Sequence, residues 1–492
     1  MKLLSVIFLA IFSISFRLYS QPSLEFENYF NDKTLRIDYY HTGDASEELV
    51  TIDQIYEYGI WAGSRKNLID KFNNGSYYVT IFDLQSGIQI FSKGFNSYFQ
   101  EYKSTEDALK GKKRTFHESV LIPSPKSRFI VNMERRNVNN ELFSFFSDTI
   151  SPQSEKILRR EFRDPAIEVS DIVANGDPHE KVDVVILAEG YTAGEKNKFK
   201  SDAARVTELF FQQEPYKTNA SNFNIYAIFK PSANSGIDEP LAKIYKQTAL
   251  SATFNSLGSE RYILTEDNKS VRDMAAHVPY DAIYIMVNHN RYGGGGIYNQ
   301  FSTFTADNQF WAYIFIHEFG HSFAGLADEY YSSPVAYNDL IPTDVEPLEP
   351  NITALRDPRK IKWKTFLTVG IEIPTPWNKK EYDETNFAWQ ALRETLNKKI
   401  SDLKQQQASL QKISAAETEY DTKSKEAAAK LAAILKRDTA LNKVGAFEGA
   451  GYSSTGLYRP MIDCIMFSIG NKPYCKICEN AINQVIMHYL EE

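Results

Sequence analysis

The residues best suited to chemistry in this chain are His317, Glu318 and His321, which form the pattern His-Glu-x-x-His. A helix turns once every 3.6 residues, so two histidines four apart project from one face and can bind the same metal ion. Glu318 lies between them, close enough to reach a water molecule at that ion and to take its proton. The pattern therefore predicts a Zn²⁺ site with His317 and His321 as ligands and Glu318 as the general base of a hydrolase.

The same pattern has a purely structural interpretation. Residues 311–316, which precede it, are apolar or aromatic, as expected of a helix buried in a core. The two histidines could then be ordinary core residues on an amphipathic helix. Further carboxylates follow the pattern at ligand distance, and they favour the metal site.

A catalytic zinc ion needs a third protein ligand and an open position for water. The metzincin spacing would place that ligand at position 327, which is an alanine here. Gly325 can end the helix because glycine adopts a left-handed conformation without strain, and Asp328 follows it by three residues. The sequence therefore predicts Asp328 as the third ligand, with Glu329 as the alternative.

The stretches that must position this site indicate an α/β arrangement. Three apolar runs are typical of buried strands: 182–188, 223–232 and 281–290. A helix is expected from about Ala193. The glycine run at 293–296 precedes the histidine pattern, and it indicates either a sheet edge that pairs with an extended peptide or a plain tight turn.

Residues 21–160 are expected to form an N-terminal domain, an antiparallel β-sandwich. Short alternating segments there are separated by Gly, Asn, Asp and Pro. Asp53 and His117 lie in this region and are expected to be surface or packing residues. A polar crossover containing proline places the domain boundary near 155–165, so the catalytic domain would span 161–492.

The stretch 382–442 differs in composition from its surroundings. It is rich in Ala, Lys, Glu, Gln and Leu and contains neither Gly nor Pro. Apolar residues three or four apart predict two long helices, which would form a hairpin inserted into the catalytic domain. A solvated structural arm is the simpler interpretation, and an element that grips substrate is the alternative.

Three cysteines lie near the C-terminus: Cys464, Cys475 and Cys478. In an oxidising compartment the simplest expectation is one disulfide and one spare thiol. A zinc site made of three cysteines is an alternative, but the sequence shows no obvious fourth ligand. A redox-active Cys-x-x-Cys would need a thioredoxin-like context, which is not visible.

Residues 1–20 have the pattern of a secretory signal peptide, with Lys2 before an apolar core and the small residue Ser20 at the end. An exported protein is therefore expected, either secreted, periplasmic or at the cell surface. The net charge of −8 without a basic block argues against nucleic acid and acidic membranes as partners. No later stretch reaches membrane-spanning length. The expected partner is a protein or peptide substrate.

Six segments share a resemblance to one family: VVILAEGYTAGE, YGGGGIYN, HEFGHSFAGLADEY, IPTPW, GAFEGAGY and YRPMIDCIMF. Together they resemble the IgA peptidase family of bacterial zinc metallopeptidases (metallopeptidase family sixty-four) over roughly 165–492. The β-rich first part resembles the N-terminal domain of that family. The resemblance implies zinc, endopeptidase chemistry and a metzincin-like catalytic domain, but it does not imply a particular substrate.

Several C-terminal residues are candidates for supporting roles. Met466 would form the metzincin-like base beneath the zinc ion, or it would simply pack in the core. Tyr458 and Arg459 could stabilise an oxyanion. Glu448 could line the cleft or support a ligand, and Glu448 and His289 are the next candidates for the third ligand.

The sequence as a whole predicts a secreted zinc endopeptidase of mixed α/β class. In this prediction a β-sandwich precedes a metzincin-like domain that carries a long helical hairpin. One alternative is an inactive zincin scaffold that serves as an adhesion or glycan-binding protein, although the intact Glu318 counts against it. Another is an amidase that acts on peptidoglycan peptides.

Overall fold

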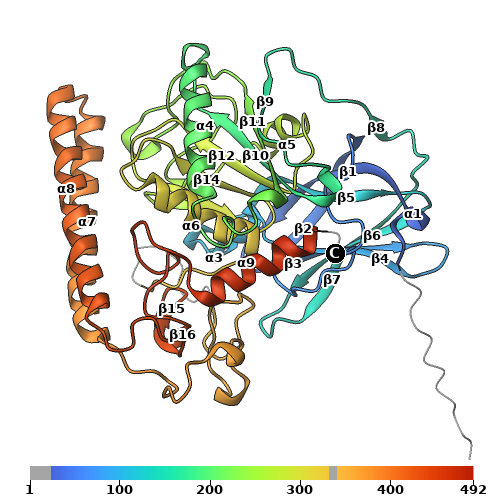
Figure 1. Ribbon diagram of the computed structural model, residues 1–492. Coiled ribbons are helices and arrows are strands. Elements are labelled where there is room, and N and C mark those ends of the chain that lie inside the picture. The colour runs from blue at the N-terminus through green and yellow to red at the C-terminus, as the bar shows by residue number, and fades with distance from the viewer. Residues whose placement is uncertain (1–23, 332–340, 491–492) are drawn as a thin grey trace, which may run out of the picture.

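The chain forms a mixed α/β structure with several sheets (Figure 1), seen here in a computed structural model. The structure describes residues 24–331 and 341–490. The segment 1–20, with its signal-peptide pattern, lies outside the described residues. Among the described helices, none is both long and apolar enough to cross a membrane.

Two four-stranded sheets make up the N-terminal part, in the orders β5-β1-β2-β8 and β4-β3-β6-β7. Their strands are β1 (Phe30–Gly43), β2 (Glu48–Tyr58), β3 (Tyr77–Asp83), β4 (Gln89–Phe95), β5 (Arg114–Pro125), β6 (Phe129–Arg136), β7 (Leu142–Ile150) and β8 (Ile157–Arg159). Neighbours pair antiparallel, except that β2 and β8 are parallel. Apolar side chains of both sheets, such as Ile37 and Val131, belong to one buried cluster. Three short helices accompany these sheets: α1 (Phe26–Tyr29), α2 (Tyr98–Lys103) and α3 (Glu106–Leu109).

A six-stranded sheet in the order β13-β14-β12-β10-β11-β9 forms the centre of the rest of the chain. Four strands run parallel: β10 (Val182–Glu189), β11 (Phe223–Phe229), β12 (Ala282–Val287) and β14 (Phe301–Thr305). The two edge strands, β9 (Glu168–Val173) and β13 (Gly294–Ile297), are antiparallel to their neighbours. The three apolar runs of the sequence are therefore strands, and β10 is buried along its whole length, as expected of a strand covered on both faces.

Three helices pack against this sheet: α4 (Lys196–Phe210), α5 (Asn268–Ala275) and α6 (Trp311–Ala324). Helix α9 (Lys476–Tyr489) packs against α6. The helix expected from about Ala193 begins as a short 3-10 turn and continues as α4. Helix α6 is fixed to the sheet by aromatic stacking. The ring of Tyr284 on β12 lies 4.5 Å from that of Phe315 and 4.7 Å from that of Phe319.

Helices α7 (Lys379–Gln405) and α8 (Leu410–Lys436) form the long hairpin that the sequence predicts (Figure 1). The hairpin is attached to the rest of the chain at both of its ends. Near its base, Leu431 and Leu435 belong to the main apolar core. Near its tip, Lys404 lies 3.1 Å from the buried carboxylate of Glu239. The hairpin therefore has more contact with the body of the protein than a solvated arm would have.

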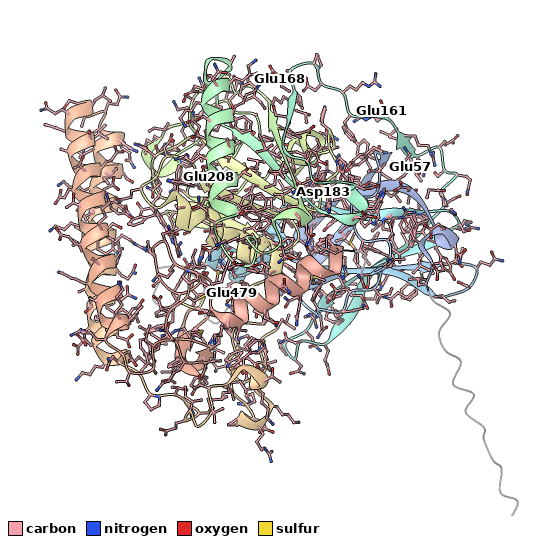
Figure 2. All side chains as sticks on the ribbon, in the orientation of Figure 1. Glu57, Glu161, Glu168, Asp183, Glu208 and Glu479 are labelled. Atoms are coloured by element: carbon pink, nitrogen blue, oxygen red, sulfur yellow. The ribbon has the colours of Figure 1, made fainter. Side chains whose placement is uncertain are left out.

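The acidic side chains are distributed over the molecule. Figure 2 shows labelled carboxylates on well-separated elements, from Glu57 on β2 to Glu208 on α4 and Glu479 on α9.

We predict that Leu435→Ala destabilises the full-length protein much more than Leu410→Ala, a matched change on the same helix. Leu435 is 1% exposed and packs in the main core, whereas Leu410 is 85% exposed. Losing a buried leucine side chain costs about 2–5 kcal/mol, and a surface change costs about 0.5 kcal/mol or less. Denaturant unfolding followed by circular dichroism measures both. Equal, small effects would show that the base of the hairpin is not part of the core.

Candidate metal centre

Helix α6 carries His317, Glu318 and His321 and is buried over most of its length. It ends at Gly325, which has a φ of 60° and a ψ of 34° and is therefore left-handed. Few residues other than glycine adopt this conformation without strain. The turn directs the following chain back toward the histidines, which confirms the expectation that Gly325 ends the helix.

Three ligand atoms converge beyond this turn. The Nε2 atoms of His317 and His321 lie 3.1 Å apart, and Asp328 Oδ1 lies 3.0 and 3.2 Å from them. Nitrogen and oxygen ligands bind zinc at about 2.0–2.1 Å, so in a tetrahedral site they are about 3.3–3.4 Å apart. The structure thus brings the three sequence-predicted ligands together in a triangle of nearly the size that a tetrahedral metal ion requires.

Backbone carbonyls orient both imidazoles. His317 Nδ1 donates to the carbonyl of Ile465 at 2.9 Å, and His321 Nδ1 donates to that of Leu326 at 2.6 Å. A carbonyl oxygen only accepts, so it selects the tautomer with hydrogen on Nδ1. In the neutral imidazoles the Nε2 lone pairs then face the centre of the triangle, as metal coordination requires.

The second carboxylate oxygen of Asp328, Oδ2, has a hydrogen-bond partner. The hydroxyl of Tyr452 donates to Oδ2. Within the described part of the chain, Oδ1 is buried and has no hydrogen bond of good geometry, although two imidazoles lie close to it. A buried carboxylate oxygen is costly unless a donor or a cation faces it. Two imidazoles and one carboxylate are also the donor set of many catalytic zinc sites, so these residues fit the metal.

The charges of the site shift the pKa values of its members. Burial lowers the pKa of His321, but the Asp328 carboxylate outweighs burial and raises it to about 9. Burial raises the pKa of Asp328, but the imidazoles, His321 first, hold it well below its usual range. Burial raises the pKa of Glu318, and the neighbouring imidazoles offset this only in part. Asp328 therefore stays ionised, and Glu318 binds a proton more readily than an exposed glutamate does.

The glycine run forms edge strand β13, which lies directly against helix α6. A Cβ atom at Gly296 would lie 2.5 Å from the backbone oxygen of Glu318, and one at Gly294 would lie 3.0 Å from Glu318 Cγ. Any larger residue would keep the strand and the helix apart. Of the two interpretations of the glycine run, the structure supports a sheet edge, and pairing with a peptide stays a prediction.

The site opens into a cavity of about 150 Å³. Its lining includes both histidines, Glu318, Asp328, and Gly294 and Gly296 of β13, and the N-terminal part contributes Asn74, Ser76 and Glu101. A larger cavity of about 370 Å³, between the N-terminal strands and helices α5 and α9, is lined by none of the candidate ligands. The chemistry of the side chains, rather than the size of the cavity, therefore identifies the site.

Three residues of the cavity wall were not singled out from the sequence: Arg261, Tyr330 and Tyr452. Arg261 Nη2 donates to the hydroxyl of Tyr330 at 2.6 Å. Tyr452 belongs to the segment GAGY, between β15 (Phe447–Ala450) and β16 (Ser453–Arg459). The resemblance of that segment to the peptidase family was the only signal that could have pointed to Tyr452.

Tyr458 and Arg459 do not line this cavity. Arg459 is fully buried, and its Nη1 donates to the carbonyl of Gly449 at 2.8 Å. Its guanidinium lies 3.8 Å from the centre of the Phe467 ring. Tyr458 is joined to Thr353 through the backbone. Both residues support the local fold, in place of the oxyanion role considered from the sequence.

The remaining candidates also lie outside the ligand triangle. Glu448 Oε1 accepts from the backbone of Gly456, and His289 lies 3.4 Å from Glu239. Met466 is fully buried beneath helix α6, where a Cβ atom at Gly320 would lie 3.0 Å from its sulfur. Met466 therefore supports the helix that carries the histidines.

The three cysteines are buried free thiols. This corrects the expectation of one disulfide with a spare thiol. The sulfur of Cys478 lies 3.5 Å from that of Cys475 and 3.8 Å from that of Cys464, so it is shared between two neighbours instead of being bonded to one.

Comparison with known families gives two matches along the chain. A family model described as IgA Peptidase M64 matches residues 170–486. A second model, described as Peptidase M64 N-terminus, matches residues 25–147. No curated protein matches the chain. The two family matches together cover most of the sequence, and the first contains the whole ligand triangle.

We predict that Gly296→Ala destabilises the protein by about 1–3 kcal/mol, the usual cost of overpacking a core, and weakens metal binding. The added methyl group would lie 2.5 Å from the backbone of Glu318 and 2.9 Å from His321 Cβ, so helix α6 must move. Gly194→Ala is the control, because its nearest neighbour would be 4.0 Å away. Denaturant unfolding and zinc competition with a chelator measure the two effects. The prediction fails if both variants behave alike.

Proposed function

The chain belongs to the M64 peptidase family, and from this premise we propose that it is a zinc-dependent endopeptidase. His317, His321 and Asp328 would hold the metal, and Glu318 would act as the general base. The observation that carries the proposal is the convergence of two Nε2 atoms and Asp328 Oδ1 within 3.2 Å of one another. The family resemblance noted in the sequence is confirmed, and the family makes the chain a peptidase that acts on proteins or peptides.

In this proposal the metal and the surrounding residues each have a separate role in hydrolysis. Zinc, when bound, supplies Lewis acidity that polarises a carbonyl group and acidifies water. Glu318 takes the proton from the attacking water and returns it to the leaving amine, a role that suits a buried carboxylate with a raised pKa. The Nδ1 hydrogen bonds of the histidines and the Tyr452–Asp328 contact keep the ligands in place.

The cavity wall offers groups for the transition state and for the substrate backbone. Arg261 and Tyr330 line the cavity and carry N–H and O–H donors, so we assign oxyanion stabilisation to them in place of Tyr458 and Arg459. Strand β13 is an edge strand, and its Gly294 and Gly296 line the same cavity. An extended peptide can bind such an edge through backbone hydrogen bonds.

The finer parts of the fold belong to this proposal as well. A β-sandwich at 21–160 is supported by the apolar core that both N-terminal sheets share. A metzincin-like catalytic domain at 161–492 is supported by the antiparallel edge strand beside the histidine helix. The hairpin at 382–442 would be an insertion into that domain.

We predict that Glu318→Gln lowers turnover of unfolded casein at least about 10²–10⁴-fold, the contribution of a positioned general base. Its zinc content should stay unchanged, because Glu318 is not part of the ligand triangle. Glu161→Gln, a change at an exposed acid, is the control and should keep full activity. The wild type should lose activity with a chelator and regain it with zinc. Near-normal turnover by Glu318→Gln at full zinc content would contradict the mechanism, and cleavage of muropeptides alone would favour a peptidoglycan amidase.

Export is also part of the proposal, on the basis of the signal-peptide pattern at 1–20. We predict that protein recovered from the cell envelope or the medium begins at Gln21. Mass spectrometry of its N-terminal peptide measures this. Recovery of the active protein only from the cytoplasm, with residues 1–20 attached, would contradict export.

A further inference from the structure

A second group of metal-binding side chains lies in the core, apart from the histidine site. It consists of Glu329, Cys464, Cys475 and Cys478, and its ligand atoms all lie within 4.8 Å of one another. Each residue is at most 4% exposed. We propose that these four residues bind a second zinc ion, which has a structural role. The proposal does not depend on peptidase activity.

The spacing of the atoms fits a tetrahedral ion. The Sγ–Sγ distances to Cys478 are 3.5 Å from Cys475 and 3.8 Å from Cys464. Glu329 Oε1 lies 3.2 Å from the sulfur of Cys478 and 3.8 Å from that of Cys475. With Zn–S near 2.3 Å and Zn–O near 2.0–2.2 Å, tetrahedral edges are about 3.8 Å between sulfurs and about 3.5 Å between sulfur and oxygen. The four distances scatter around these values.

Glu329 supplies the fourth ligand that the sequence did not reveal. Its side chain is fully buried. Oε1 accepts from Asn351 Nδ2 at 3.1 Å, and Oε2 has no hydrogen-bond partner among the described residues. A carboxylate buried among three sulfurs is costly unless a cation compensates it. A divalent ion bound to Glu329 and the sulfurs would provide that compensation.

The backbone around the cysteines is arranged to stabilise thiolates. Cys475 is the N-cap of the 14-residue helix α9, and Cys478 lies in its first turn. The positive end of a helix dipole favours negative charge there. The backbone N–H groups of Cys475 and Met466 point at Cys464 Sγ, at 3.1 and 3.4 Å. The Cys-x-x-Cys spacing is also that of many structural zinc sites.

The second site would stabilise the first. Asp328 and Glu329 are consecutive, so one peptide unit joins the two groups of ligands. The backbone N–H of Glu329 donates to the carbonyl of Met466 at 2.8 Å, and the adjacent carbonyl of Ile465 accepts from His317 Nδ1. An ion held by Glu329 and Cys464 would therefore fix the segment that orients His317. Four buried protein ligands leave no open position for substrate, as is typical of structural zinc.

The test is the metal content of the full-length protein after exhaustive dialysis, measured by mass spectrometry. We expect about two zinc ions per chain, because structural and catalytic sites both bind zinc tightly. Asp328→Asn should lose the ion of the histidine site, and Cys478→Ser should lose the other one. One ion in the wild type, removed by Asp328→Asn, would overturn the proposal even if the peptidase proposal is correct.

A spectroscopic measurement on the wild type guards against misfolding of Cys478→Ser. Cobalt substituted for zinc should give a thiolate-to-cobalt charge-transfer band in the near ultraviolet, and Asp328→Asn should retain this band. Three thiols should react in denaturant after chelator is added. The absence of the band, or an intact mass two hydrogens lighter because of a disulfide, would overturn the second site.

Discussion

The left-handed turn at Gly325 is the constraint on which the candidate metal centre depends. If helix α6 continued in its own direction, the residues after His321 would point away from the face that carries both histidines. The turn instead returns the chain, so that Asp328 meets both imidazoles and the next residue, Glu329, faces the opposite way toward the cysteines. One backbone conformation therefore determines where two adjacent carboxylates lie.

Close packing around helix α6 makes this arrangement rigid. The rings of Phe315 and Phe319 stack on Tyr284 of the sheet, and Met466 lies beneath Gly320. Glycines of strand β13 lie directly against the helix. A buried helix held on several sides has little freedom to rotate or to slide. Ligands on such a helix keep their geometry before a metal binds, which reduces the cost of binding.

Local spacing was sufficient to predict much of this structure. The two histidines, the helix end at Gly325, the position of Asp328, the buried strands and the helical hairpin all follow from periodicity or from single residues with special backbone preferences. What the sequence did not reveal depends on contacts between distant segments. Tyr452 reaches Asp328 from a turn far along the chain. Asn74 reaches the end of α6 from the loop between β2 and β3.

The cysteines and Arg459 show the same limit. The residue types indicated a disulfide between two of the cysteines and an oxyanion-stabilising role for Arg459. The neighbours of these residues in the fold do not support either role. Glu329 lies against the sulfurs, and backbone carbonyls and aromatic rings surround the guanidinium of Arg459. No local pattern in the sequence encodes such long-range neighbours.

The most direct test of the account is anomalous X-ray diffraction from crystals of the full-length protein, recorded just above the zinc absorption edge. The account predicts an anomalous peak about 2.0–2.2 Å from His317 Nε2, His321 Nε2 and an oxygen of Asp328. A peak coordinated by other residues, or zinc-loaded crystals with no peak between these three side chains, would contradict it.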